Sequence, residues 1–135
     1  MATQVFINLP VKDLEKSKAF FAQLGYSFNP QFTNENAACM VISDTIYSML
    51  LTEPFFQSFT PKTIANAHTT KEVLICLSCE SRAQVDEMVK KAVAAGGKVA
   101  PAEPIDYGFM YSHGFEDLDG HNWEIVFMDP SHVQE

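Results

Sequence analysis

A single acidic side chain within an apolar strand pattern is the strongest candidate for chemistry in this sequence. Glu124 follows residues 119–120, an Asp-Gly pair typical of a tight hairpin turn, because glycine takes the positive φ that such a turn demands. After the turn, Trp123 and Ile125 alternate with Glu124 and Val126, so the two sets face opposite sides of the predicted strand. The acid therefore lies on the wet face of an edge strand, which is the simpler interpretation, or points into a ligand pocket.

Two further side chains with acid–base chemistry lie on the strand expected to pair with that of Glu124. If Tyr111 or His113 faced a cleft together with Glu124, the pair could exchange a proton with a substrate. A position on the rim without chemistry is the alternative interpretation for His113. A displaced metal site built on Glu124 and His113 would still need a third ligand. The remaining histidines fall in the connector, the turn and the tail: His68, His121 and His132.

The cysteines do not form a metal-binding or redox motif. Cys76 and Cys79 are three residues apart on a predicted strand, so their thiols point to opposite faces and cannot share an ion or a disulfide. The chain has an odd number of cysteines, three, and begins without a basic leader segment, which favours a reducing cytoplasmic location. We find no glycine-rich phosphate loop and no Ser-His-Asp arrangement.

Composition narrows the classes of partner. The 135 residues suit one compact domain, and the formal net charge of −8 argues against nucleic acid and anionic membranes. The apolar runs are far shorter than the roughly 18 residues of a membrane span. We therefore expect a small-molecule ligand, and neither nucleic acid nor a membrane as partner.

The element pattern β-α-β-β-β occurs twice. In the first half, strands are predicted at 5–9, 26–32, 38–42 and 46–52, with a helix between the N-cap Asp13 and the stop at Gly25. In the second half, strands are predicted at 73–79, 98–102, 109–115 and 122–128, with a helix between the capping box at 81–84 and the glycines at 96–97. The two modules run from about 4 to 52 and from about 72 to 129.

The connector, about 53–71, carries Phe55, Phe56 and Phe59 and a predicted short helix at 62–67. These aromatic side chains pack on the core or on a partner, or they form a lid over a pocket. Because they are spare aromatics on a small domain, they favour a homodimer.

Each module has one helix, which covers one face of its strands and leaves the other face for a cleft. This arrangement is an α+β fold. By alternation, the residues predicted to line the cleft and bind a ligand are Phe6, Asn8, Leu74, Cys76 and Glu124.

Three stretches together resemble one known superfamily. The strand-to-helix sequence at 8–21 (NLPVKDLEKSKAFF), the closing hairpin at 115–124 (FEDLDGHNWE) and the helix at 81–97 resemble the glyoxalase/bleomycin-resistance/extradiol-dioxygenase, or vicinal oxygen chelate, superfamily. The resemblance spans the chain and implies a single domain, 1–135, in which two βαβββ modules form a curved mixed sheet around a cleft. It does not specify the function, because this superfamily includes lyases, epimerases, dioxygenases, thiol transferases and drug-binding proteins.

The resemblance also identifies where a metal would bind. Metal-dependent members carry His, His and Glu at positions that correspond to Phe6, Leu74 and Glu124 here. One carboxylate does not hold a first-row divalent ion, which needs three or more ligands. We therefore expect no cofactor at the usual place, while a rebuilt metal site stays open.

Two functions remain as predictions. The first is a metal-free small-molecule binder of the bleomycin-resistance type, with Glu124 orienting the ligand. The second is an enzyme of the lyase/isomerase or dioxygenase type that uses Glu124 as a general base or as ligand of a rebuilt metal site.

Overall fold

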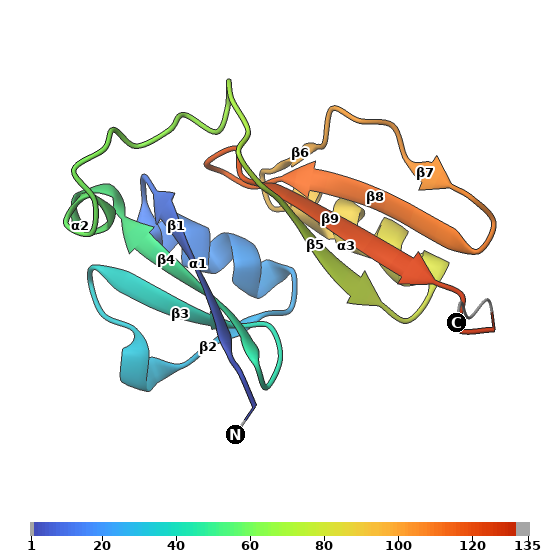
Figure 1. Cartoon of the computed structure of the whole chain (residues 1–135), viewed down its shortest axis with the longest axis horizontal. Coiled ribbons are helices and arrows are strands. Elements are labelled where there is room, and N and C mark those ends of the chain that lie inside the picture. The colour runs from blue at the N-terminus through green and yellow to red at the C-terminus, as the bar shows by residue number, and fades with distance from the viewer. Residues whose placement is uncertain (1, 132–135) are drawn as a thin grey trace. The chain divides into compact units, whose positions relative to one another are not determined.

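The computed structural model describes residues 2–131, which form two compact units that divide between Asn66 and Ala67. His132 lies outside the described residues. Each unit places one long helix against a mixed sheet (Figure 1). The first unit follows the β-α-β-β-β order that the sequence predicts, and the second follows it with one additional two-residue strand, Ile105–Asp106. The α+β class and the two-module fold are confirmed. None of the helices within 2–131 is long and apolar enough to cross a membrane.

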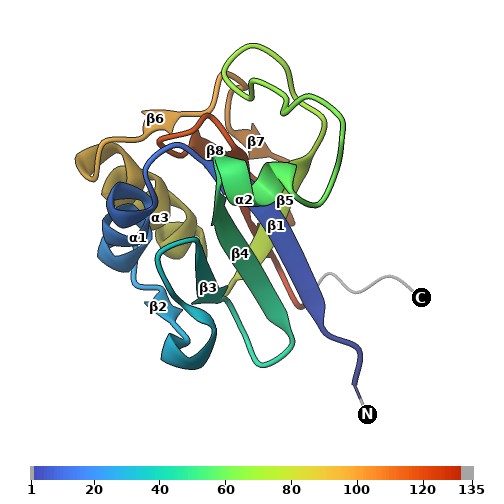
Figure 2. The same cartoon turned by 90° about the vertical axis from the view of Figure 1, so that its left-hand side faces the viewer.

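The first unit is a four-stranded sheet in the order β1-β4-β3-β2, in which β1 runs parallel to β4. Figure 2 shows α1 on one side of this sheet and α2 at the end of β4. The elements are β1 (Val5–Val11), α1 (Leu14–Gln23), β2 (Ser27–Phe28), the 3₁₀ helix η1 (Pro30–Phe32), β3 (Ala37–Val41), β4 (Ile46–Thr52) and α2 (Glu53–Gln57).

Helix α1 begins and ends where the sequence predicts. The Asp13 side chain accepts a hydrogen bond from the Lys16 backbone N–H at 3.1 Å, which satisfies a free donor of the first turn. Phe20 and Phe21 are almost fully buried and pack edge to face at 4.9 Å between ring centroids. Gly25 then takes a φ of +104°, which ends the helix.

The second unit has strand order β5-β9-β8-β6, and β7 pairs with β8 beyond β6. Helix α3 packs on β8 and β9 and buries Val85, Val89 and Ala92. The Ser81 side chain caps this helix by accepting from the Gln84 backbone N–H at 3.1 Å. The elements are β5 (Leu74–Cys79), α3 (Arg82–Ala94), β6 (Lys98–Val99), β7 (Ile105–Asp106), β8 (Met110–Glu116) and β9 (Asn122–Met128).

A buried carboxylate holds the β8–β9 turn. Asp117 accepts hydrogen bonds from the Trp123 indole N–H at 3.0 Å and from the backbone N–H groups of Asp119 and His121 at 2.9 and 3.0 Å. Burial raises the pKa of the Asp117 carboxyl above its usual value, although His121 and the N–H donors act in the opposite direction. Trp123 is only 1% exposed, so this acceptor serves a donor that water cannot reach.

Three predicted elements differ from those in the structure, and proline accounts for much of the difference. The strand predicted at 26–32 ends at Phe28, because Pro30 starts a 3₁₀ helix. The connector helix is α2, with Pro54 in its first turn, and not the segment 62–67. The strand predicted at 98–102 stops at Val99, before Pro101.

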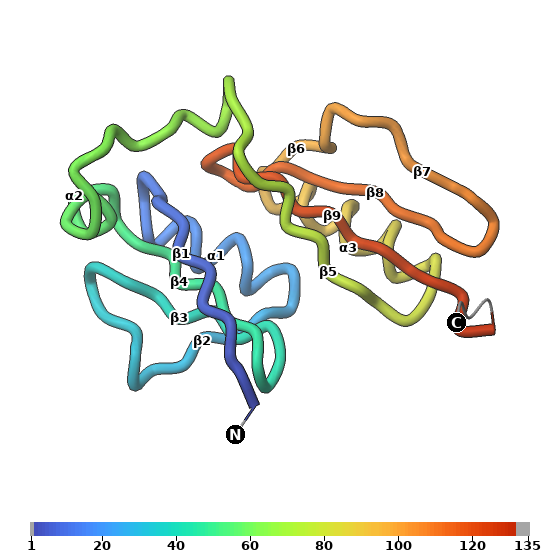
Figure 3. Tube along the Cα trace, in the orientation of Figure 1, coloured from blue at the N-terminus to red at the C-terminus, as the bar shows by residue number. Residues whose placement is uncertain are grey.

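The edge of the second sheet is interrupted between β6 and β7. Val99 pairs with Phe115 and Ile105 with Ser112, so the five residues 100–104 lie opposite only two residues of β8. Pro101 and Pro104 lack the N–H groups that would continue the pairing. Figure 3 traces this excursion of the chain between β6 and β7.

Candidate functional site

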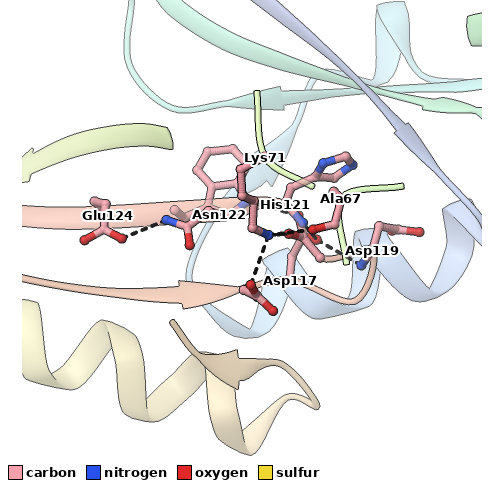
Figure 4. Close-up of polar contacts among 10 residues, drawn as sticks. Ala67, Lys71, Asp117, Asp119, His121, Asn122 and Glu124 are labelled. Carbon is pink, nitrogen blue, oxygen red and sulfur yellow. Dashed lines mark hydrogen bonds and ion pairs between the residues drawn. The ribbon is translucent and has the colours of Figure 1, made fainter. Parts of the chain in front are cut away.

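Glu124 lies on the face of the second sheet opposite α3, which we call the open face. Its strand neighbours Trp123 and Ile125 are buried on the α3 side, whereas Glu124 is half-buried. The Asn122 side-chain amide donates to Oε2 of Glu124 at 2.7 Å (Figure 4). Among the described residues Oε1 has no hydrogen-bond partner, so one oxygen of the carboxylate is fixed and the other is available.

Gly114 provides the space in which the Glu124 carboxyl group lies. It is directly opposite Glu124 across the β8–β9 pair. A Cβ atom at this position would meet the Glu124 Cδ at 2.7 Å and the Trp123 carbonyl oxygen at 2.8 Å, both closer than real Cβ contacts. The open face therefore requires glycine here for reasons of space.

Cys76 lies beside Glu124 on the other side, because β5 pairs with β9 in parallel and aligns these two residues. The residue is exposed, and its thiol is free. Partial desolvation of the thiol by the atoms around it and, after it, the negative charge of Glu124 raise the pKa of Cys76. The thiol thus stays protonated to a higher pH than an isolated cysteine, which makes it a poor nucleophile near neutrality.

This arrangement gives a prediction about thiol reactivity. Glu124→Gln removes the neighbouring charge, so the pKa of Cys76 should fall and its alkylation by iodoacetamide at pH 8 should become faster. The rate is followed by mass spectrometry of the Cys76 peptide, with the Cys39 peptide as an internal control for a buried thiol. Equal Cys76 rates in the two proteins would show that the carboxylate does not act on the thiol.

An ion pair borders the open face next to the turn. Lys71 Nζ lies 3.0 Å from a carboxylate oxygen of Glu116 and also donates to the carbonyl oxygens of Ala67 and Gly120. Lys71 therefore attaches the end of the connector to the β8–β9 turn. Because Glu116 neutralises it, this lysine does not neutralise Glu124.

Tyr111 and His113 do not share a face with Glu124, so the predicted acid–base pairs with Glu124 are wrong. His113 is directly opposite Ile125 in the β8–β9 pair and so faces α3. The Tyr111 hydroxyl donates to Asp86 of α3 at 2.6 Å, and this hydrogen bond raises the pKa of Tyr111. Both side chains are separated from Glu124 by the sheet itself.

In the first unit, Phe6 and Asn8 alternate with the buried Leu9 and Val11 along β1, so they lie on the face of the sheet opposite α1. The Phe6 ring is 49% exposed and stacks on Tyr47 with 4.9 Å between centroids. A pocket of about 420 Å³, which we call the connector pocket, is lined by Asn8, Leu51, Phe56, Phe59 and Thr60. Two connector aromatics thus contribute walls to a pocket, in which Asn8 carries the only side-chain amide.

The remaining predicted ligand residue, Leu74, is 60% exposed at the start of β5. Within 2–131, no group of three His, Cys, Asp or Glu side chains is placed to hold one metal ion. The side chains of Asn122 and Cys76 bring polar atoms next to Glu124.

Sequence and structure comparisons identify relatives of this arrangement. A family model described as bleomycin resistance protein-like N-terminal matches residues 3–43. A solved glyoxalase/bleomycin resistance protein/dioxygenase family enzyme from Burkholderia phytofirmans PsJN superposes with a TM-score of 0.75 at 16% identity, covering 94% of this chain and 99% of that chain. The chain belongs to the glyoxalase/bleomycin-resistance/dioxygenase superfamily.

Two other solved structures agree with this chain in fold and differ in what their names describe. A hypothetical protein from S. aureus is 31% identical, with a TM-score of 0.78 over 94% of this chain and 95% of that chain. A genomically encoded fosfomycin resistance protein from Listeria monocytogenes is 19% identical, with a TM-score of 0.67 over 97% of both chains. No curated protein matches the chain.

Sequence reasoning missed two residues of this vicinal oxygen chelate chain that position Glu124. Asn122 is two residues before it, and strand alternation alone places the two on one face. Gly114 follows from counting the pairing back from the turn, which aligns residue 116 with 122 and hence 114 with 124.

Proposed function

We propose that this superfamily member binds a small molecule without the usual divalent metal, and that Glu124 orients the ligand. The observation that carries the proposal is the state of the Glu124 carboxylate. It is half-buried on the open face, with Oε2 held by Asn122 and Oε1 unoccupied by any described residue. A fixed acceptor on a partly apolar surface gives a ligand its orientation, as in most small-molecule sites.

The residues at the superfamily's metal positions do not fit a metal. Phe6 and Leu74 offer no ligand atom, and Glu124 is the one donor among the three positions. The Glu124 carboxylate also accepts a hydrogen bond from the neutral side-chain amide of Asn122. This contact suits a carboxylate that accepts hydrogen bonds from a ligand without binding a metal ion.

Metal analysis tests this part of the proposal. Protein purified without chelators is expected to contain far less than one equivalent of zinc, iron, manganese or nickel by elemental analysis, because three ligands are lacking. Near-stoichiometric metal that is lost in Glu124→Ala would contradict it, whereas metal that persists in that variant would be bound elsewhere.

The residues proposed to bind the ligand with Glu124 are Leu74 and Cys76, which share the open face with it, Asn8, which lines the connector pocket, and Phe6, which shares a sheet face with Asn8. A protein-observed NMR screen of isotope-labelled, metal-free protein against small carbonyl and aromatic compounds tests whether these residues bind a ligand together with Glu124. Saturable binding of an unchanged compound that shifts the backbone signals of these residues would support a binding protein. A screen in which no compound shifts the signals of these residues would refute the assignment.

An enzyme is the second candidate, and the available oxygen of Glu124 is the observation that favours it. Oε1 can accept a proton from a carbon next to a carbonyl group, as a general base does. Turnover of a 2-oxo or enolisable compound during the same screen, lost in Glu124→Gln, would favour the enzyme over the binder. Tyr111 and His113, which face α3, have no part in this step.

We also propose that the protein is a homodimer through the connector aromatics. Phe59 is 70% exposed and packs on Phe55 with 5.1 Å between ring centroids, which leaves an aromatic surface for a second copy. Light scattering at micromolar concentration should give twice the chain mass, and Phe59→Ser should weaken the dimer. Phe32→Ser, an exposed aromatic elsewhere in the same unit, should leave it intact. A monomeric wild type would refute this proposal.

The remaining proposals about partners and location rest on charge and cysteine state. The net charge of −8 disfavours nucleic acid and anionic membranes as partners. The cysteines Cys39, Cys76 and Cys79 are free thiols, which suits the cytoplasm.

A further inference from the structure

A second cavity lies on the α3 side of the second sheet, away from Glu124. It has a volume of about 480 Å³, within the range of small-molecule sites. We call it the α3 groove. Its apolar wall consists of Val89, Val93, Ala94 and Val99, and its polar side chains are Asp86, Lys90 and His113.

The groove exists because the edge of the sheet is interrupted at this place. A regular strand would continue β6 past Val99 and lie opposite His113, but the chain departs from the edge at Pro101. His113 therefore pairs with Ile125 of β9 on one side and, within residues 2–131, has no strand residue opposite it on the β6 side. Val99 and Val93 remain 49% and 44% exposed, so apolar surface faces the groove without being covered.

The polar groups of the groove differ in whether they are already engaged. Asp86 accepts the Tyr111 hydroxyl at 2.6 Å, and Arg82 lies over that tyrosine ring at 4.7 Å from its centroid. Lys90 and His113, in contrast, make no hydrogen bond or ion pair with any residue between 2 and 131. The polar side chains of the groove that remain available to a ligand are thus the Lys90 ammonium group and the His113 imidazole, beside an apolar wall.

We propose that the α3 groove binds a small amphiphilic carboxylate, with the carboxylate at Lys90 and His113 and the apolar body against Val89, Val93 and Val99. A carboxylate accepts from the ammonium group and from an imidazole N–H, while the wall removes hydrocarbon from water. A cationic ligand would have Asp86 as its only acid in the groove, and that carboxylate already serves Tyr111. This site is independent of the function proposed for Glu124.

The test is an NMR titration of the isotope-labelled full chain with 4-phenylbutyrate, its amide and 4-phenylbutylamine. The carboxylate should shift the backbone signals of Val93, Val99 and His113 and bind about fivefold more tightly than the amide, as a partly exposed ion pair allows. The amine should bind more weakly than the amide. Equal or stronger binding of the amine, or shifts confined to other residues, would overturn the proposal.

Substitutions in the groove test the contributions of the Lys90 charge and of the apolar wall to binding. Lys90→Gln should remove the advantage of the carboxylate over the amide. Lys91→Gln, an identical charge change at the next residue, should preserve it because Lys91 pairs with Glu87 and does not line the groove. Val93→Glu, at an exposed helix position, should weaken 4-phenylbutyrate at least tenfold. If Lys90→Gln and Lys91→Gln behaved alike, the lysine would have no specific role and the proposal would fail.

Discussion

Asp117→Ala is expected to lower the free energy of unfolding of the second unit by about 3 kcal/mol or more. The change leaves the buried indole N–H of Trp123 without an acceptor, and each unsatisfied buried donor costs about 1 to 3 kcal/mol. It also removes the acceptor for the Asp119 and His121 backbone N–H groups, which hold the turn. The protein has one tryptophan, Trp123, so denaturant unfolding followed by fluorescence reports on this unit directly.

Graded variants show whether the hydrogen bonds cause the loss. Asp117→Asn keeps one acceptor oxygen and should fall between wild type and Asp117→Ala. Asp44→Ala, an exposed acid in a turn of the first unit, should leave the fluorescence transition unchanged. Folding raises the pKa of Asp117, so the stability that this carboxyl contributes falls as the pH rises through its pKa in the folded protein. The difference in stability between wild type and Asp117→Ala should therefore be largest in acid. An Asp117→Ala protein as stable as wild type would contradict the role assigned to this turn.

Gly114→Ala is expected to displace the Glu124 side chain and to lower stability by about 1 to 3 kcal/mol, the range for overpacked positions. The added methyl group would lie 2.7 Å from the Glu124 Cδ and 2.8 Å from the Trp123 carbonyl oxygen. The side chain can rotate away, whereas the backbone carbonyl cannot. Ligand affinity should therefore fall together with stability, in contrast to Glu124→Gln, which keeps the shape.

A double variant separates the two contacts. In Gly114→Ala/Glu124→Ala the shortened side chain no longer meets the methyl group, so the double variant should regain part of the stability lost in Gly114→Ala. The part that is not regained measures the contact with the Trp123 carbonyl. Strict additivity of the two single changes would mean that Gly114 does not provide the space for Glu124.

The sequence predicts the fold well because its helix ends carry local signals. Asp13 and Gly25 bound α1, and Ser81 caps α3, through contacts between residues close in the chain. The exceptions occur where proline determines the backbone conformation and ends a strand. Pro30 and Pro101 interrupt strands that the apolar pattern alone would continue.

The candidate site was only partly predictable, because its geometry depends on the register between strands. Alternation within β9 correctly separates Glu124 from Trp123 and Ile125. It says nothing about β8, where the turn at 117–120 sets the register that puts Gly114, and not His113, on the face of Glu124. A shift of one residue exchanges the two faces, so the sequence alone does not separate the face of His113 and Tyr111 from that of Glu124.

The most direct test of the role of Glu124 is a titration of the metal-free protein with a compound found in the ligand screen. Glu124→Gln is expected to weaken binding at least tenfold, or about 1.4 kcal/mol, since hydrogen bonds to charged groups contribute that much or more. Its unfolding curve should match that of wild type, and Glu87→Gln, the same change on α3, should bind like wild type. Unchanged affinity in Glu124→Gln would contradict the account and leave Glu124 as an acid on a wet strand face.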